Sequence, residues 1–363
     1  MAEDVRAPAD APITDLAACD GYAVAAASLA DGALTARVVD EVRADTTERL
    51  NLVAGATARI ASGAPMPVGA DAVVPLEDTD GGAAVVTFHR TVVPGANVRP
   101  RAGDAASGDL MLSEGQRVGP RQITLLSATG RGRVLVRPKP RVVIISVGDE
   151  LLEPGRPAKE GQVYDANGHA LSTGVFDAGG VALRVGAVPD EVGTLREAIE
   201  DQLVRADLVI TTGGLSAGDT VRDVVGALGQ VRFDRVAISP GGAFGVGVIE
   251  DGLTPVFCLP GNPVAVQVAY ETFVRPALRK MAGYAELFRP SLRAAAVGRW
   301  DSPAGVRQFV PVKLSGSPRE GYQAEALTDS LTDLARANAL AVVREEVTEV
   351  AASEQVDCLI LDA

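Results

Sequence analysis

The chain has 363 residues, of which 47% are hydrophobic, and this excludes an intrinsically disordered protein while allowing two or three folded domains. Its formal net charge is −13 and it contains no block of basic residues. Nucleic acid is therefore excluded as a partner, because contacts to phosphates need a face rich in lysine and arginine.

The N-terminal segment and the cysteines indicate the compartment. The first eighteen residues carry four acids and no apolar core, which is unlike a signal peptide, and no apolar run approaches membrane-spanning length. The three cysteines, Cys19, Cys258 and Cys358, are far apart, so neither a disulfide framework nor a structural zinc site is expected. We expect a cytoplasmic protein with no membrane partner.

The first third of the chain is rich in short apolar runs separated by turn residues, a pattern typical of a small β-rich domain. Strands are predicted at 22–24, 34–39, 57–60, 72–75 and 84–88. Farther on, Pro120 in the first turn and Gly130 beyond the end predict a helix at 120–129. Two more strands are predicted beside it, at 110–112 and 133–136.

Residues 141–280 alternate between strand-like and helix-like segments. Strands are predicted at 142–147, 181–188, 208–212, 233–238, 245–249 and 256–259. Helices are predicted at 165–176, 192–203 and 221–228, and from a cap at Asn262 through Phe273. This alternation predicts a doubly wound, mostly parallel sheet with helices on both faces.

The last part of the chain, residues 286–363, returns to β character. Strands are predicted at 292–297, 309–314, 322–326, 340–343 and 358–361. Short strands separated by turns predict a small barrel or sandwich.

The stretch 207–219 suggests a ligand site within the α/β region. A buried strand is followed by Gly213, Gly214, Ser216 and Gly218, and then by a helix. Glycines at such a position let a ligand approach backbone N–H groups, and a helix N-terminus favours an anion. A tight turn without any ligand explains this segment equally well.

Acidic residues follow several of the predicted strands. Glu150, Asp190 and Asp219 come after the strands at 142–147, 181–188 and 208–212, and Pro260-Gly261-Asn262-Pro263 follows the last one. Ligands bind at the carboxyl ends of such strands, and gathered carboxylates beside phosphate favour Mg²⁺. Each acid taken alone is better explained as a helix cap. The residues themselves predict only an anionic or phosphorylated small molecule bound with a metal.

Six short motifs in a defined order resemble the molybdopterin molybdenumtransferase family. They are Asp-Gly-Tyr-Ala-Val at 20–24, Gly-Ala-Pro at 63–65 with 69–74, Ser-Val-Gly-Asp-Glu-Leu at 146–151, Asp-Ala-Asn at 165–167, Thr-Gly-Gly at 212–214 with 216–219, and Leu-Pro-Gly-Asn-Pro-Val at 259–264. Each motif is short, but together they cover most of the chain.

The resemblance implies an α/β multidomain protein. It implies an elongated domain at 1–15 and 97–137, a small β-rich domain at 16–96, a central molybdopterin-binding doubly wound sheet at 138–285, and a C-terminal β-barrel at 286–363. It implies a homodimer, and a reaction that converts adenylyl-molybdopterin and molybdate to molybdenum cofactor, AMP and water with Mg²⁺.

Matching the functional positions of the family one by one assigns roles to residues of this chain. Those implied to be catalytic are Asp20, Ser62, Asp104, Glu150 and Asp190. Those implied to bind substrate are Gly213, Gly214, Ser216, Asp219, Arg235, Pro260, Gly261, Asn262 and Pro263. The metal would be held by Glu150, Asp190 and Asp219, while Asp20 and Ser62 would come from the partner subunit.

The chain also departs from the family pattern. Residues 239–243 read Ser-Pro-Gly-Gly-Ala where the family has two lysines, the loop after Asp219 is shorter, and Gly103 replaces a common glutamate. The N-terminal helix of the family is also expected to be absent or trimmed. A catalytically weakened paralogue that binds molybdopterin as a carrier or regulator therefore remains an alternative. An adenylyltransferase or nucleotide hydrolase on the same α/β domain is a third.

Overall fold

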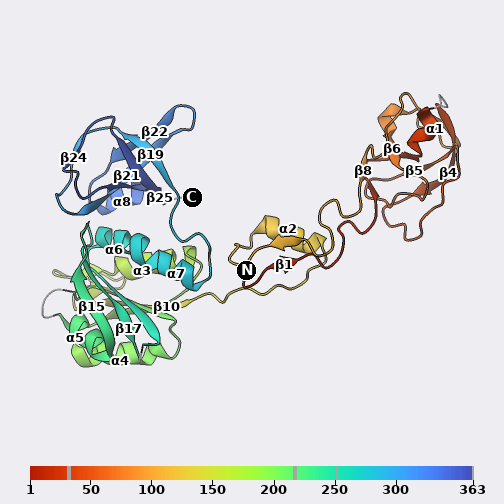
Figure 1. Cartoon of the computed structure of the whole chain (residues 1–363). Helices are drawn as coiled ribbons and strands as arrows, with labels where there is room; N and C mark the ends of the chain where they lie inside the picture. Colours follow the sequence, from red (N-terminus) through yellow and green to blue (C-terminus); the bar gives the residue numbers. More distant parts are fainter. Residues whose placement is uncertain (31–33, 216–218, 251, 362–363) are drawn as a thin grey trace. The chain divides into compact units, whose positions relative to one another are not determined.

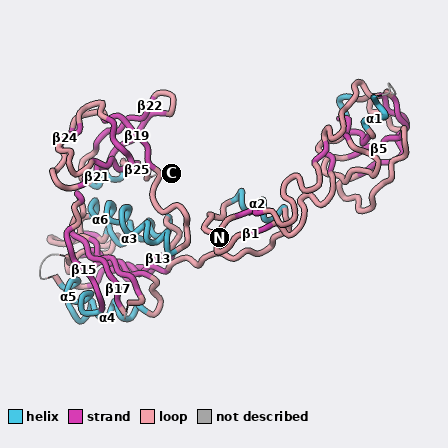
Figure 2. The backbone as a smooth tube through the Cα atoms, in the orientation of Figure 1, coloured by secondary structure: helices cyan, strands magenta, loops and turns pink. Residues whose placement is uncertain are grey.

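The computed structural model describes residues 1–30, 34–215, 219–250 and 252–361. The chain divides into two compact units, Met1–Val136 and Arg137–Ala363. Unit 1 is mostly strands and loops with short helices, whereas unit 2 contains the longer helices (Figures 1 and 2).

Unit 1 contains a five-stranded sheet with strand order β6-β3-β5-β4-β7. The strands are β3 (Gly21–Val24), β4 (Thr35–Val42), β5 (Ala56–Ile60), β6 (Ala72–Pro75) and β7 (Val85–Thr87). Along β3, Tyr22 and Val24 pack in one apolar cluster with α1 (Ala26–Ala30), whereas Ala23 packs in another. The alternation places an apolar layer on each face of the sheet, and the predicted strands of this region are confirmed.

The rest of unit 1 is built from two distant segments that run side by side. β1 (Val5–Arg6) pairs with β9 (Leu110–Leu112), and β2 (Leu16–Ala17) pairs with β8 (Val98–Arg99), both antiparallel. The helix α2 (Pro120–Ala128) follows, as predicted. The predicted strand at 133–136 is wrong. In that segment the Leu135 carbonyl accepts one hydrogen bond, from the Ala2 N–H, and its side chain stays exposed.

Unit 2 contains a six-stranded sheet with strand order β13-β10-β14-β18-β17-β15. The strands are β10 (Arg141–Val147), β13 (Val181–Val188), β14 (Leu208–Thr212), β15 (Gly229–Arg235), β17 (Ala243–Ile249) and β18 (Thr254–Leu259). The neighbouring strands β13, β10, β14 and β18 are parallel to one another, and β17 is antiparallel to both of its neighbours, β18 and β15. The mostly parallel sheet predicted from strand–helix alternation is confirmed.

Helices cover both faces of this sheet. Val142 and Ile144 pack with the helices α3 (Ala166–Asp177), α6 (Pro263–Ala269) and α7 (Arg275–Met281). Val143 and Ile145, which alternate with them along β10, pack with α4 (Val192–Leu203) and α5 (Thr220–Leu228) on the other face. A strand buried on both sides explains the unbroken apolar run in the sequence.

Two predicted elements of unit 2 have different bounds. The strand predicted at 233–238 starts at Gly229, directly after α5, because an extended glycine allows close pairing with β17. The helix that starts at Pro263 does not end at Phe273. It continues through a π-helical turn, Tyr270–Val274, into α7, because Val274 and Leu278 continue the buried stripe. The π turn precedes Pro276, which lacks a donor for a regular helix.

The C-terminal part of unit 2 is a closed five-stranded barrel. Around the barrel the order is β21 (Arg307–Ser317), β22 (Gly321–Ala326), β19 (Ser291–Ala296), β25 (Gln355–Ile360) and β23 (Ala339–Val343), which pairs back with β21. A short strand from the α/β part, β16 (Ile238–Ser239), joins β21 in parallel. A helix that the sequence did not predict, α8 (Leu331–Arg336), contacts α6.

Candidate functional site

The carboxyl ends of β13, β10, β14 and β18 are neighbours along one edge of the sheet in unit 2. A cavity of about 560 Å³ opens at this edge. Four of the residues predicted as site residues line it, namely Glu150, Gly213, Gly261 and Pro263. Because the strands are parallel, residues more than a hundred positions apart reach one cavity.

The glycines after β14 allow a close approach of backbones. Gly213 has φ of +90°, and a Cβ atom there would lie 2.4 Å from the Val147 carbonyl oxygen. Gly214 has φ of +62°, and a Cβ atom there would lie 2.7 Å from the Val221 side chain. No other residue type fits Gly213 without movement of the backbone.

An asparagine joins three of the loops around the cavity. The Nδ2 of Asn167, in the first turn of α3, donates to Thr212 Oγ1 at 3.0 Å and to the Gly261 carbonyl at 2.8 Å. The Thr212 hydroxyl donates in turn to the Pro260 carbonyl at 2.8 Å. Asn167 therefore connects α3 to the ends of β14 and β18. The sequence showed it only as part of the Asp-Ala-Asn motif.

Asn262 and Pro263 begin α6. The Asn262 side chain accepts a hydrogen bond from the Ala265 N–H at 3.1 Å, so it caps the helix. Pro263 occupies the first helical position and lines the cavity, whereas Asn262 does not. The capping interpretation accounts for Asn262 without a ligand.

Glu150 is the exposed acidic residue in the cavity wall, which the buried Asp165 also lines. Its carboxylate lies over Gly148, where an added Cβ atom would be 2.6 Å from Glu150 Oε2. Its side chain is exposed, and within the described part of the chain its carboxylate makes no hydrogen bond or ion pair. The structure leaves this carboxylate available to a ligand.

Asp190 lies at the end of β13 and outside this cavity. Its N–H donates to Asp149 Oδ1 at 3.1 Å, and the Thr220 hydroxyl donates to its carbonyl at 3.3 Å. Its Oδ1 atom is buried and has no hydrogen-bond partner. A buried carboxylate oxygen without a partner is costly, so Asp190 has the capacity to accept a cation or a donor from a ligand.

The remaining predicted binding residues are less informative. Asp219 stands at the N-cap position of α5, and Ser216 lies outside the described residues. Arg235 is exposed at the end of β15 and does not line the cavity. Among the residues that the structure describes, no three histidine, cysteine, aspartate or glutamate side chains gather in a group that could hold a metal ion.

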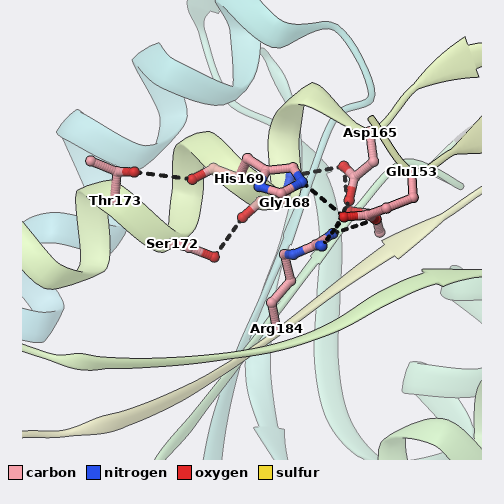
Figure 3. Close-up of polar contacts among 8 residues, drawn as sticks. Glu153, Asp165, Gly168, His169, Ser172, Thr173 and Arg184 are labelled. Carbon is pink, nitrogen blue, oxygen red and sulfur yellow. Dashed lines mark hydrogen bonds and ion pairs between the residues drawn. The ribbon is translucent and has the colours of Figure 1, made fainter. Parts of the chain in front are cut away.

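An ion-pair network around the buried Asp165 supports the cavity from the side of β13 (Figure 3). The Nη1 of Arg184 donates to Glu153 Oε2 and to Asp165 Oδ2, each at 3.0 Å, and its Nη2 also binds Glu153. Asp165 is 1% exposed and caps α3 by accepting from the Gly168 N–H at 2.8 Å. It also accepts from the Ser146 hydroxyl at 2.8 Å. Both carboxylate oxygens of the buried Asp165 thus have hydrogen-bond partners.

This network connects elements that carry cavity residues. Glu153 follows β11 (Leu151–Leu152), which begins directly after Glu150. The pKa of Glu153 is lowered chiefly by the hydrogen bond from Arg184. Arg184 thereby ties the segment after Glu150 to the N-terminus of α3, where Asn167 lies. Sequence reasoning did not select Arg184, although a single charged residue inside an apolar strand was a usable signal.

In unit 1, two predicted residues are in contact. Asp20 Oδ1 accepts from the Ser62 N–H at 2.7 Å, and the Ser62 hydroxyl donates to the Ala18 carbonyl at 3.3 Å. Burial raises the pKa of the adjacent Cys19 thiol, and the charges of Glu77 and Asp20 add to the effect. Asp104 is engaged differently, in an ion pair with Arg99 at 2.7 Å.

Comparison with known proteins identifies the domains. Residues 1–130 match the model of the MoeA N-terminal region (domain I and II), residues 143–280 match a probable molybdopterin binding domain, and residues 293–361 match the MoeA C-terminal region (domain IV). Among the described residues, no helix has the length and apolar character needed to cross a membrane.

Relatives match over nearly the whole chain. Molybdopterin molybdenumtransferase 2 of Mycobacterium tuberculosis is 37% identical over 97% of this chain and 90% of its own length, and molybdopterin molybdenumtransferase 1 of that organism is 35% identical over 99% and 91%. The crystal structure of the molybdopterin biosynthesis protein moeA from Pyrococcus horikoshii has a TM-score of 0.83, with 32% identity over 100% of this chain and 91% of that one. This chain belongs to the molybdopterin molybdenumtransferase family.

Proposed function

We propose that this chain inserts molybdate into adenylyl-molybdopterin and releases AMP, and that the reaction occurs at the carboxyl edge of the sheet in unit 2. The proposal depends on one observation, which is that Glu150, Asn167, Gly213 and Gly261 converge on a cavity of about 560 Å³. That volume is within the usual range for small-molecule sites. The names and coverage of the relatives support the same activity.

Different residues of the cavity have different proposed roles. The glycines of the loops after β14 and β18 let phosphate oxygens approach the backbone, and the N-termini of α3 and α6 favour negative charge there. Asn167 keeps the two loops together through its bonds to Thr212 and Gly261. The exposed carboxylate of Glu150 would help to hold a metal ion, and that ion would orient and polarise the attacking oxyanion.

Mg²⁺ fits the acidic residues near this edge. Asp190 has a buried oxygen without a partner, and Asp149 lies in hydrogen-bond contact with its backbone. Mg²⁺ binds through one or two carboxylates together with substrate phosphates, so a cage of three protein ligands is not required. We assign Asp190 and Glu150 as its ligands, with Asp219 at the next helix N-terminus. When bound, the ion would neutralise phosphate charge.

We further propose that the active form is a homodimer in which Asp20 and Ser62 of one subunit complete the site of the other. The direct contact between Asp20 and the Ser62 N–H supports a shared role for them. Mixing Asp20→Asn and Glu150→Gln subunits tests it. A random mixture of two inactive variants recovers about a quarter of wild-type activity if the site is shared, because half of the dimers carry one intact site. Absence of recovery in mixed dimers contradicts shared sites.

The central experiment measures AMP released from adenylyl-molybdopterin by the purified protein, with and without molybdate and Mg²⁺. We expect release that requires molybdate and increases with Mg²⁺. Binding of molybdopterin without any molybdate-dependent AMP release would overturn insertion. That result would select the carrier alternative, which residues 239–243 favour because they lack a cation.

The cytoplasm is the compartment we propose for this activity. Cys19, Cys258 and Cys358 are all free, as expected where thiols stay reduced. Cell fractionation with an antibody to the chain tests this, and recovery in a membrane or secreted fraction contradicts it.

A further inference from the structure

The cavity at the carboxyl edge has an apolar side that the reaction described above does not use. Val163 and Tyr164 of β12 (Val163–Tyr164) line it, as does Leu331 of α8. These side chains are 52%, 46% and 58% exposed, respectively. Large apolar side chains gathered around a hollow and open to water mark a surface that a ligand covers.

Tyr164 is held in place although it is exposed. Its hydroxyl donates to the Arg156 carbonyl at 2.7 Å, and its strand pairs in parallel with β11. The ring therefore keeps a defined position in the cavity wall before any ligand arrives. A rigid aromatic side chain binds a flat ring at a low cost in conformational entropy.

Leu331 comes from a different part of unit 2. It is the first residue of α8, which Ser330 caps by accepting a hydrogen bond from the Asp333 N–H at 3.1 Å. α8 contacts α6, the helix that begins with the cavity residue Pro263. The barrel thus completes the wall of a cavity that otherwise belongs to the α/β part.

We propose that Tyr164, Val163 and Leu331 form a subsite for a flat nitrogen heterocycle of the substrate, joined to a phosphate that the glycine loops bind. The inference rests on the proposed function, whose substrate contains two such rings, adenine and pterin. The two sides of the cavity match this chemistry. Gly213, Gly261 and Asn167 present polar groups, whereas β12 and α8 present an aromatic ring and aliphatic carbon.

Calorimetric titration of the full-length protein with AMP, and separately with molybdopterin, tests the subsite. We expect Tyr164→Ala and Leu331→Ser each to weaken binding of one of these ligands roughly tenfold, which corresponds to one ring contact. Weakening confined to AMP assigns the subsite to adenine, and weakening confined to molybdopterin assigns it to pterin. Tyr164→Phe keeps the ring and is expected to retain most of the affinity.

Phe288→Ala is the matched control, because Phe288 is 71% exposed in the same unit and does not line the cavity. It should leave both affinities unchanged, and thermal unfolding should show that all variants fold. Unchanged affinity for both ligands in folded Tyr164→Ala and Leu331→Ser proteins would overturn the subsite.

The binding measurement is independent of turnover, so the two proposals can fail separately. If substitution of Tyr164 weakens AMP binding but AMP release does not depend on molybdate, the ring subsite is supported and the proposed insertion is wrong. If AMP release depends on molybdate but the affinities for AMP and molybdopterin are unchanged by substitution of Tyr164 and Leu331, the insertion proposal is supported and the subsite proposal is wrong.

Discussion

The two units of the chain bring their candidate residues together in different ways. In unit 2, Glu150, Gly213 and Gly261 share one cavity because each follows a strand of the same parallel sheet. In unit 1, Asp20 and Ser62 meet through a single backbone contact beside antiparallel strands, while Asp104 is paired with Arg99. In a parallel sheet the residues that follow each strand lie at the same edge. Neighbouring antiparallel strands end at opposite edges, so residues that follow them are not brought together in this way.

This difference also changes what supports each group. The cavity in unit 2 is backed by the ion-pair network of Arg184, Glu153 and the buried Asp165, so several side-chain contacts set its geometry. The contact between Asp20 and Ser62 is exposed. We therefore expect substitutions in unit 2 to affect stability and activity together, and those in unit 1 to separate the two.

The largest effect is expected from Arg184→Met. It leaves the buried carboxylate of Asp165 without its cation, which should lower the free energy of unfolding by about 3 kcal/mol. Urea unfolding measures this, and the remaining folded enzyme should show a reduced kcat because Glu150 and Asn167 lose their support. Arg184→Lys should recover part of both. Arg196→Met removes an exposed ion pair with Glu200 and should cost little. Equal effects at positions 184 and 196 would contradict a supporting role.

A smaller loss is expected from Gly213→Ala. The new Cβ atom would lie 2.4 Å from the Val147 carbonyl oxygen at φ of +90°, so the loop must shift, at a cost of about 2 kcal/mol. AMP release should fall with it. Gly226→Ala, in α5 with open space around it, should be neutral or stabilising by up to about 1 kcal/mol. Thermal unfolding of both variants decides whether the conformation at Gly213 is needed.

Asp20 separates stability from activity in unit 1. Asp20→Asn keeps an acceptor for the Ser62 N–H, so folding should be unchanged while AMP release falls. Asp20→Ala removes the acceptor and should also lower the free energy of unfolding by about 1 kcal/mol. Ser62→Ala keeps the backbone donor and reports on the hydroxyl alone. Full activity in Asp20→Asn would remove Asp20 from the catalytic set.

The smallest effect is the dependence of stability on pH through Glu153. The hydrogen bond from Arg184 lowers the pKa of this carboxyl below its ordinary value of 4.5. Its stabilising contribution is therefore present above pH 4.5 and is lost as the pH falls through the lowered value. The stability difference between wild type and Glu153→Gln, measured in urea, should shrink on acidification. In an Arg184→Met background the difference should change less with pH, because only the hydrogen bond with His169 then lowers the pKa of Glu153. A constant difference in wild type would refute the coupling.

The sequence alone determined the parts of the molecule that follow from local pattern. Apolar runs bounded by glycine and proline located β14 and β18, and the parallel order predicted that Glu150, Gly213 and Gly261 would share an edge. Gly213 was recognisable because its position after a buried strand requires a residue without a Cβ atom. The bounds that differed, at Gly229 and beyond Phe273, depended on strand pairing and on a buried helical stripe.

Only the tertiary structure showed which ion pair supports the cavity and which apolar side chains line it. Arg184 and Asp165 are nineteen residues apart and meet because α3 packs on the sheet in which β13 is an edge strand. Leu331 reaches the cavity from a helix of six residues, which is too short to show a helical period in the sequence. Contacts of this kind depend on how distant elements pack, and a local pattern carries no record of them.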